Sequence, residues 1–182
     1  MTETECYHCE GTGWNGYDKV TKKMKACECQ NARRIRILLE NPEILGLTNV
    51  DIKRFTFRNF KPTKQTAGVG QSQARAMAKH YKDWVANKFN FLTISGSTGF
   101  GKTHLAKAAV VELVKKGSRP YYSRAVELNR QLRNFDDGEA DRYRDQLTNA
   151  PYLVLDDVGV EHDPRGYLQS IYHGVIDDRY SY

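Results

Sequence analysis

The chain has 182 residues, of which 40% are hydrophobic and 27% charged, a balance typical of a globular protein with its own core. It contains no run of about 18 apolar residues, which excludes a membrane-spanning helix. Its start, MTETECYHC, lacks the basic and apolar regions of a secretory signal. We therefore expect a cytoplasmic protein with no membrane partner.

The net charge of +6 is unevenly distributed along the chain. Residues 1–90 hold 16 Lys and Arg against 9 Asp and Glu, a balance of +7, whereas residues 91–182 hold 12 against 13, a balance of −1. A basic front half suits contact with nucleic acid or with an acidic partner. The alternative is a basic surface that only faces solvent, and charge alone does not distinguish the two.

All four cysteines lie near the start of the chain, as a C-x2-C pair and a C-x-C pair separated by 17 residues. In the cytosol such clustered pairs indicate metal ligands rather than disulfides. Residues 1–30 are therefore predicted to form a zinc-binding element. Its predicted ligands are Cys6, Cys9, Cys27 and Cys29. The C-x-C pair is tighter than usual, and unrelated free thiols, a redox pair, or replacement of one ligand by His8 or His80 are the alternatives. A closed site of this kind organises a fold and does not catalyse.

Residues 31–65 are predicted to form a basic linker that packs on the next domain, and residues 66–182 form an α/β domain. The linker contains the helical stretch NARRIRILLE, the breaker Asn41-Pro42 and the aromatic stretch FTFRNFKP. The α/β domain is expected to contain helices over 72–88, 102–116 (ended by Gly117), 125–135 and 166–180, and strands over 91–95, 119–123 and 152–157. This alternation predicts a parallel sheet flanked by helices.

The segment SGSTGFGKTHLA, residues 95–106, fits the phosphate-loop pattern G-x-x-x-x-G-K-[ST]. Its glycines let backbone N–H groups turn toward phosphate oxygens, and the helix that follows adds its positive N-terminal end. The predicted nucleotide contacts are Gly96, Ser97, Thr98, Gly99, Phe100, Gly101, Lys102, Thr103 and His104. Lys102 would reach the β- and γ-phosphates of ATP, and the Thr103 hydroxyl would ligate Mg²⁺. The alternative is a glycine-rich turn without a ligand.

The segment YLVLDD, residues 152–157, is an apolar strand that ends in two acids. Asp156 is predicted to hold Mg²⁺ through its water shell, and Asp157 to polarise the attacking water. Together with Lys102 they are the candidate catalytic residues. Many phosphate-loop ATPases carry Glu where Asp157 stands, and the shorter side chain requires a closer water. A strand that ends in an ordinary acidic turn is the alternative.

Four motifs occur in a specific order: C-x2-C-x-G-T-G-W with its C-E-C partner, FTFRNF, GSTGFGKTHLA and LVLDDVG. Over nearly the whole chain this order resembles the DnaC-type helicase loaders of bacteria and phages, AAA+ ATPases related to transposase helpers. The resemblance implies a sheet of order 5-1-4-3-2, ATP-dependent self-association, contact with single-stranded DNA and delivery of a ring-shaped replicative helicase. It also implies that the zinc element is the helicase adaptor. Phe57 and Phe60 would flank adenine, or alternatively pack in the core.

Strands one to three of that sheet can be assigned, at 91–95, 120–123 and 152–157. The family's strands four and five, polar sensor, arginine finger and helical lid have no counterpart before Tyr182. We therefore expect an AAA+ domain that is incomplete at its C-terminus. Since an arginine finger is worth ~10³ or more in rate, this chain alone is expected to bind ATP but barely hydrolyse it, whereas the full-length form would be an ATPase.

Three rival functions remain from the sequence. The first is a transposase helper, which nothing in residues 1–182 excludes, although the zinc element favours the loader. The second is a non-catalytic fragment that captures a partner through the zinc element and linker. The third is a zinc-dependent co-chaperone, whose C-x2-C-x-G-x-G motif would need four copies and occurs here once.

Overall fold

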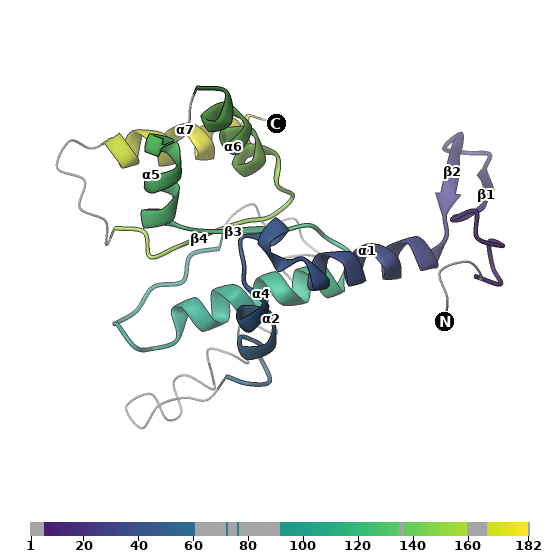
Figure 1. Ribbon diagram of the computed structural model, residues 1–182, viewed down its shortest axis with the longest axis horizontal. Helices are drawn as coiled ribbons and strands as arrows, with labels where there is room; N and C mark the ends of the chain where they lie inside the picture. The colour runs from purple at the N-terminus through teal and green to yellow at the C-terminus, as the bar shows by residue number, and fades with distance from the viewer. Residues whose placement is uncertain are drawn as a thin grey trace.

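The computed structural model describes residues 6–60, 72, 76, 92–134, 137–159 and 167–181. At its centre lies a two-stranded parallel sheet of β3 (Tyr121–Arg124) and β4 (Leu153–Asp156). Tyr121 pairs with Leu153 and Arg124 with Asp156, so both strands end at the same edge. Figure 1 shows α5, α6 and α7 on one side of this sheet and α1, α2 and α4 on the other. The described part of the chain is therefore layered α/β, as predicted.

The remaining described elements are six α-helices, one 3₁₀ turn and a hairpin. The helices are α1 (Glu28–Glu40), α2 (Asn49–Arg54), α4 (Lys102–Lys115), α5 (Ala125–Asn134), α6 (Asp137–Asn149) and α7 (Tyr167–Tyr180), with a 3₁₀ turn η1 (Pro42–Leu45) before α2. An antiparallel hairpin, β1 (Trp14–Asp18) and β2 (Lys23–Ala26), stands at the start of α1. None of the described helices combines the length and apolar character that a membrane crossing requires.

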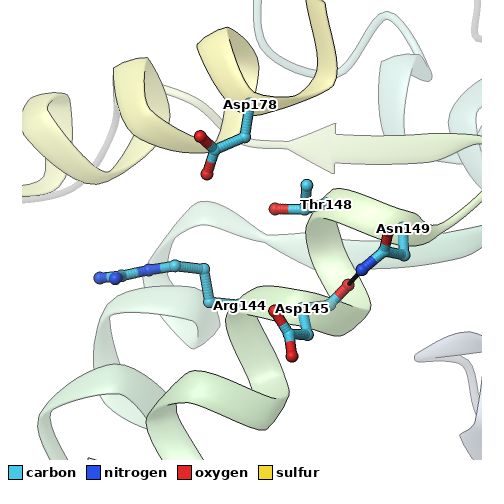
Figure 2. A pocket seen from close by; sticks show the side chains of 5 residues that line it. All are labelled: Arg144, Asp145, Thr148, Asn149 and Asp178. Carbon is cyan, nitrogen blue, oxygen red and sulfur yellow. Dashed lines mark hydrogen bonds between the residues drawn. The ribbon is translucent and has the colours of Figure 1, made fainter. Parts of the chain in front are cut away.

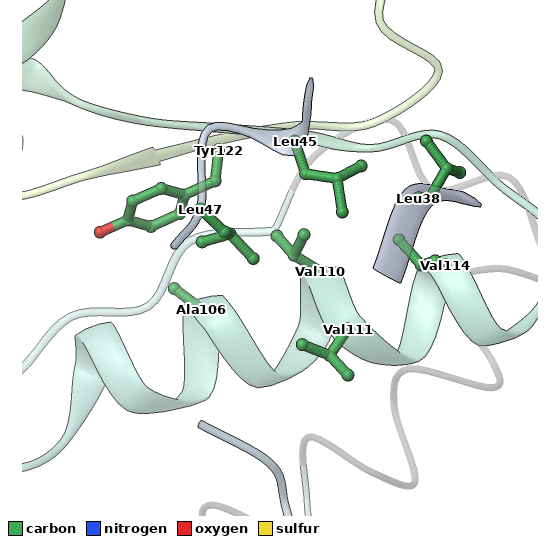
Figure 3. Packing of buried hydrophobic residues seen from close by; sticks show 8 residues of the cluster. All are labelled: Leu38, Leu45, Leu47, Ala106, Val110, Val111, Val114 and Tyr122. Carbon is green, nitrogen blue, oxygen red and sulfur yellow. The ribbon is translucent and has the colours of Figure 1, made fainter. Parts of the chain in front are cut away.

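Two apolar clusters cover the two faces of the central sheet. Successive strand residues point to opposite faces, so Tyr122 belongs to one cluster and Tyr121 packs against the other. The first cluster, shown in Figure 3, joins the linker to α4 and comprises Leu38, Leu45, Leu47, Ala106, Val110, Val111, Val114 and Tyr122. The second is built by α5, α6 and α7 and comprises Ala125, Leu128, Tyr143, Leu147, Ile171, Tyr172 and Val175.

The linker packs tightly on the sheet at Gly46, in line with the prediction. Gly46 ends η1 with a φ of +72°, and a Cβ atom there would collide with the carbonyl oxygen of Tyr122. The neighbouring Leu45 and Leu47 are both buried in the first cluster. Only glycine allows both the left-handed turn and this close approach.

The predicted helix over 102–116 is confirmed as α4, and its end is the predicted one. The N–H of Gly117 donates to the carbonyl of Val114 (2.8 Å), and the N–H of Ser118 donates to that of Leu113 (3.1 Å). This pair of bonds closes the last turn of a helix. The expected elements over 119–123, 125–135, 152–157 and 166–180 likewise correspond to β3, α5, β4 and α7.

The predicted strand over 91–95 is wrong for its described part, because residues 92–97 form no strand. In the order 5-1-4-3-2, the neighbours of this strand are strands four and five, and the residues described here contain neither. Without a neighbour, the N–H and C=O groups of a strand have no ladder to join. Leu92 is accordingly 44% exposed. The helix predicted over 72–88 lies outside the described residues, apart from Ser72 and Ala76, which are helical.

Candidate nucleotide-binding site

The predicted phosphate loop turns directly into the first turn of α4. Gly101 is the N-cap of α4, with a φ of +80°, and its carbonyl accepts from the N–H of Leu105 (3.0 Å). A Cβ atom on Gly101 would lie 2.6 Å from the ring of Phe60, so the loop is pressed against that ring. The amides at the start of a helix have no partner within the helix and attract anions. The local structure therefore suits a phosphate.

Lys102 is held inside the loop by the loop's own backbone. Its Nζ atom donates hydrogen bonds to the carbonyls of Gly96 (2.8 Å) and Ser97 (2.9 Å). The N–H of Phe100 reaches the carbonyl of Ser97 across the same turn (3.4 Å). A positive charge is thus fixed among the residues that the sequence predicts to surround the phosphates.

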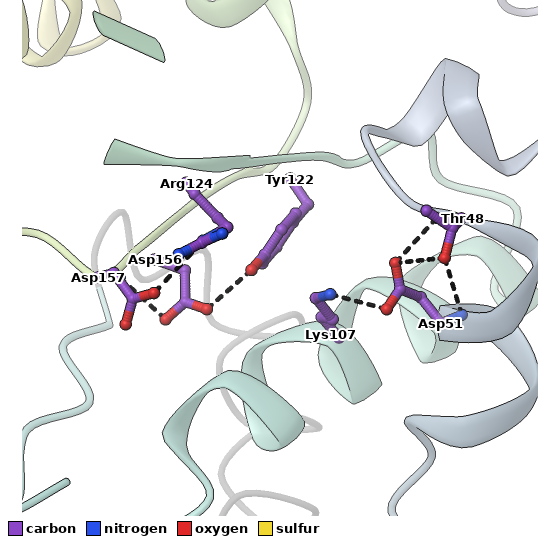
Figure 4. Close-up of polar contacts among 7 residues, drawn as sticks. All are labelled: Thr48, Asp51, Lys107, Tyr122, Arg124, Asp156 and Asp157. Atoms are coloured by element: carbon purple, nitrogen blue, oxygen red, sulfur yellow. Dashed lines mark hydrogen bonds and ion pairs between the residues drawn. The ribbon is translucent and has the colours of Figure 1, made fainter. Parts of the chain in front are cut away.

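The two acids at the end of β4 are held by different partners, as Figure 4 shows. Asp156 is 7% exposed, and its Oδ2 accepts from the hydroxyl of Tyr122 (2.8 Å) while its Oδ1 accepts from the N–H of Asp157 (3.0 Å). Burial, together with the neighbouring Asp156 carboxylate, raises the pKa of Tyr122. The Tyr122 hydroxyl therefore remains a donor across the physiological range. Asp157 has a φ of +56° and forms an ion pair with Arg124 (3.4 Å).

The phosphate loop and the acids lie on the same side of the molecule. In Figure 1 the N-terminal end of α4 and the carboxyl ends of β3 and β4 point the same way. Thr103 stands in the first turn of α4 and Asp156 at the last position of β4. A bound phosphate and a metal at this edge would have loop amides, a hydroxyl and a carboxylate within one region.

A buried ion pair that the sequence did not predict connects α4 to the linker. Lys107 Nζ bonds to Asp51 Oδ1 (2.7 Å), and the two side chains are only 14% and 12% exposed. The other Asp51 oxygen accepts from the N–H (2.9 Å) and the hydroxyl (2.8 Å) of Thr48. Lys107 also lies over the ring of Tyr122, 5.1 Å from its centre. The spacing of Thr48 and Asp51 fits a capping box, which could have been found in the sequence, whereas nothing local marks Lys107.

An aromatic group surrounds His104 beneath the loop. The Nε2 atom of His104 hydrogen-bonds to the carbonyl of Thr56 (2.8 Å), and its ring meets those of Phe55 (5.2 Å between centres) and Phe60 (5.1 Å) edge-on. Phe60 therefore lies beside the phosphate loop. The other ring that contacts His104 is that of Phe55, not that of Phe57. Adenine contact by Phe57 and Phe60, and nucleotide contact by His104, stay predictions.

The four cysteines come together as predicted. All four Sγ atoms lie within 4.8 Å of one another, with 3.7 Å from Cys6 to Cys27 and 3.4 Å from Cys9 to Cys29. A tetrahedral zinc with Zn–S bonds of about 2.3 Å separates its sulfurs by about 3.8 Å, so the cluster fits this ion. His8 is exposed, and His80 lies outside the described residues.

Backbone contacts prepare this cluster for a metal. The N–H of Gly13 donates to the sulfur of Cys9 (3.3 Å). Burial opposes ionisation of Cys9, but the Gly13 amide and the neighbouring thiols outweigh it and lower the pKa of Cys9 to about 7. Its partner Cys29 changes in the opposite direction, since the adjacent Cys9 raises the pKa of Cys29 to about 12. Without a metal, the cluster therefore favours ionisation of Cys9 over ionisation of Cys29. Binding of a metal would require the remaining thiols to ionise as well.

A polar hollow of about 280 Å³ lies between α6 and α7, away from these residues (Figure 2). Its lining residues are Arg144, Asp145, Thr148, Asn149 and Asp178. The amide of Asn149 donates to the carbonyl of Asp145 (2.9 Å), so part of the lining serves to end α6. The hollow contains none of the predicted nucleotide contacts.

Comparison with known proteins settles the family. Residues 33–182 match the model of the IstB-like ATP binding proteins. The chain belongs to this family. The IstB-like chain is thus an AAA+ phosphate-loop protein of an ATP-binding family, and its cysteine cluster lies wholly before the matched region. No solved structure is significantly similar to it.

Curated relatives of the IstB-like chain include an uncharacterized protein, replication initiators and an insertion-sequence protein. It is 26% identical to YdaV, an uncharacterized protein of Escherichia coli (strain K12), over 88% of this chain and 64% of YdaV. It is 30% identical to the chromosomal replication initiator DnaA of Aquifex aeolicus (strain VF5), over 68% of this chain and 31% of DnaA. A Pseudomonas fluorescens protein of insertion sequence IS1162, named for ATP binding, is 37% identical over 53% of this chain and 42% of its own length. The chain therefore spans less than two thirds of each of these relatives.

Proposed function

We propose that this IstB-like chain binds ATP with Mg²⁺ and loads a replicative helicase onto single-stranded DNA. The observation that carries the proposal is the joining of two units by one helix. Cys29 of the cysteine cluster stands in the first turn of α1, and Leu38, near the end of α1, is buried against α4. A metal-binding adaptor is thereby attached to the helix that begins at the phosphate loop. The relation to replication initiators supports a role in replication.

In this proposal each residue of the site has a defined role. The loop amides and the start of α4 hold the phosphates, and Lys102 exchanges its bonds to the Gly96 and Ser97 carbonyls for phosphate oxygens. The Thr103 hydroxyl would ligate Mg²⁺ and Asp156 would hold it through its water shell; the ion would supply positive charge against the phosphates. Tyr122 fixes the orientation of that carboxylate. Asp157 orients the attacking water.

Contacts between α4 and the linker provide a route from the nucleotide to the adaptor. His104, two residues after Lys102, bonds to the carbonyl of Thr56, and Lys107 bonds to Asp51. A change at the phosphate loop therefore acts on residues 48–60 and, through α1, on the zinc element. We assign residues 1–30 to the adaptor, 31–65 to the coupling linker and 66–182 to the ATP-binding part, which self-associates when ATP is bound.

A transposase helper is the second candidate function. The relation to the IS1162 protein, at 37% identity, favours it. In such a helper the same ATP site would control contact with a transposase instead of a helicase.

Complex formation separates the two candidates. The chain is mixed with the replicative helicase of its source organism, or with an IS21-type transposase from it, and complexes are measured by light scattering with and without ATP and Mg²⁺. The loader proposal predicts an ATP-dependent complex with the helicase that Lys102→Ala weakens, and helicase transfer onto a DNA circle coated with single-strand-binding protein. A complex with the transposase alone would support the second candidate and contradict the first.

A further inference from the structure

An irregularity in the N-terminal hairpin places two aromatic rings on one face. Trp14 pairs with Ala26 and Tyr17 with Met24, and the register shifts between Trp14 and Tyr17. Directly opposed residues share a face of a sheet, as do residues two apart on one strand such as Met24 and Ala26. Trp14 and Tyr17 therefore lie on the same face despite being three residues apart. Without the shift, one of the two rings would point to the other face.

This hairpin face, made by Trp14, Tyr17 and Met24, is open to solvent. The three side chains are 45%, 57% and 50% exposed. Figure 1 shows the hairpin at the far end of α1, standing away from the two packed layers. Large apolar side chains that gather on one exposed face mark a binding surface more often than isolated ones do.

The hairpin is also strongly basic. Residues 14–26 contain four lysines and one aspartate. The lysines are all exposed: Lys19, Lys22, Lys23 and Lys25. The carboxylate of Asp18 accepts from the N–H groups of Val20 (2.8 Å) and Thr21 (3.2 Å), so this charge serves the turn. A face with stacking rings and surrounding ammonium groups matches a polymer with flat bases and a charged backbone.

We propose that the hairpin face binds single-stranded nucleic acid by stacking bases on Trp14 and Tyr17. The inference deepens the proposed function, on which it rests, by assigning the DNA contact to the zinc element. Their partners Met24 and Ala26 are two residues apart, so the backbone positions of Trp14 and Tyr17 are about 7 Å apart along the hairpin, a spacing that allows each ring to take one of two neighbouring bases. Lys19 and Lys22, in the turn beside this face, neutralise phosphates next to the stacked bases, whereas Lys23 and Lys25 alternate to the other face of the hairpin. Paired bases in a duplex present no free face to these rings.

Trp14 provides a direct optical test in the full zinc-loaded chain. Trp84→Phe leaves Trp14 as the single tryptophan, and its fluorescence is followed while oligo-dT is added. We expect quenching that saturates with single strands and not with a duplex of equal length. Trp14→Ala and Tyr17→Ala should each weaken oligo-dT binding about tenfold, as the loss of one base stack does, whereas Trp14→Phe should restore most of the affinity. Tyr180→Ala, which removes a similarly exposed ring (58%) from α7, is the matched control and should change nothing.

Charge reversal tests the same surface independently of the rings. The double variant Lys19→Glu, Lys22→Glu changes only the turn and should weaken binding of oligo-dT. It should also reduce the salt dependence: the slope of log K against log salt concentration falls by about 0.7 for each phosphate that is no longer neutralised. Zinc content of every variant shows that the hairpin is intact. Unquenched Trp14, equal binding of duplex, or unchanged affinity in both Trp14→Ala and the double variant would overturn the inference. Quenching of Trp14 by an acidic protein partner of the chain, without quenching by DNA, would also overturn it and would show that the hairpin face binds protein. ATP binding at Lys102 is unaffected by all of these variants, so the proposed function can stand when this inference fails.

Discussion

The hydroxyl of Tyr122 in β3 donates a 2.8 Å hydrogen bond to the carboxylate of Asp156 in β4. Strand β3 thereby fixes the orientation of the Asp156 carboxylate, which β4 presents at the edge of the sheet near the phosphate loop. Because the second Asp156 oxygen is bound to the N–H of Asp157, both oxygens have a defined direction. A carboxylate held in this way is prepared for a metal.

Tyr122→Phe should weaken Mg²⁺-dependent ATP binding about tenfold, which is typical when a metal-binding group is deprived of its hydrogen-bond partner. ATP affinity measured with and without Mg²⁺ checks this, because only the difference between the two should shrink. Tyr143→Phe is the matched control, because the Tyr143 hydroxyl is also buried and forms a hydrogen bond with the hydroxyl of Ser123 (3.1 Å), but it lies in the second apolar cluster, away from Asp156. The control should lower stability similarly and leave the Mg²⁺ effect unchanged. Equal loss with and without Mg²⁺ in Tyr122→Phe would show that Tyr122 acts on the fold alone.

Lys107→Met should cost about 2–4 kcal/mol of stability, because it leaves the Asp51 carboxylate buried without its partner. Lys115→Met is the control on the same helix. Its ion pair with Glu112 is exposed (48% and 32%), and its loss should cost at most about 0.5 kcal/mol. Denaturant unfolding of the two variants gives the comparison, and equal costs would refute the importance of the Asp51–Lys107 pair.

The same ion pair makes stability depend on acid. Burial alone would raise the pKa of Asp51, but the hydrogen bonds and charge of Lys107 and Thr48 hold it below its usual range. A lowered carboxyl pKa contributes stability that is fully present above the unfolded value of about 4 and is lost as the pH falls through the folded value. Without Lys107 the pKa of Asp51 rises, so the variant takes up this proton at a higher pH than the natural chain does. The stability difference between the natural chain and Lys107→Met should therefore be constant near neutrality and shrink as the pH falls toward the lowered pKa of Asp51 in the natural chain. A difference that grows toward acid would contradict this assignment.

Gly46→Ala should destabilise the chain by more than about 2 kcal/mol, since it adds strain at a φ of +72° to a collision with the Tyr122 carbonyl. Gly174→Ala should have the opposite sign. Gly174 lies within α7 with no atom within 4 Å of an added Cβ, so alanine should stabilise by up to about 1 kcal/mol. Thermal unfolding of both variants tests whether the linker is fixed to β3 at this point.

Removing zinc should unfold the hairpin and spare the two helical layers. The four cysteines hold the hairpin to the start of α1, whereas the apolar clusters contain no cysteine. We expect one zinc per chain, its loss in Cys27→Ser, and weaker binding at lower pH because the thiols must ionise. Metal analysis and amide exchange check this. Loss of protection in α4 after chelation would show that the layers depend on the metal.

Local motifs in the sequence predict much of the structure. The phosphate loop and the start of α4 follow from one glycine-rich pattern, and Gly117 ends α4 at the predicted position. The pairing of β3 with β4 followed from the family resemblance, because nothing in either strand specifies its neighbour. Contacts between distant segments, such as Tyr122 with Asp156 (34 residues apart) and Lys107 with Asp51 (56 apart), had no sequence signal.

The missed elements have physical reasons. The hairpin lacks the regular alternation of apolar and polar residues that predicts a strand, because its register shifts between Trp14 and Tyr17. The glycines of GTGWNGY therefore suggest turns in the sequence. Helix α6 is largely polar, and it is held to α5 and α7 by Tyr143 and Leu147, four residues apart. Residues 92–95 of the strand expected over 91–95 do not form one, because apolar character alone does not make a strand, and no segment among the described residues pairs with them.

Equilibrium binding of ATP to the chain, with and without Mg²⁺, tests the central claim most directly. We expect saturable binding that Mg²⁺ strengthens and that Lys102→Ala weakens about tenfold or more, as the loss of a charged hydrogen bond does. Lys115→Ala, at the other end of α4, should leave ATP binding unchanged. Binding that is absent, or equal in the Lys102 and Lys115 variants, would contradict an ATP site at the start of α4.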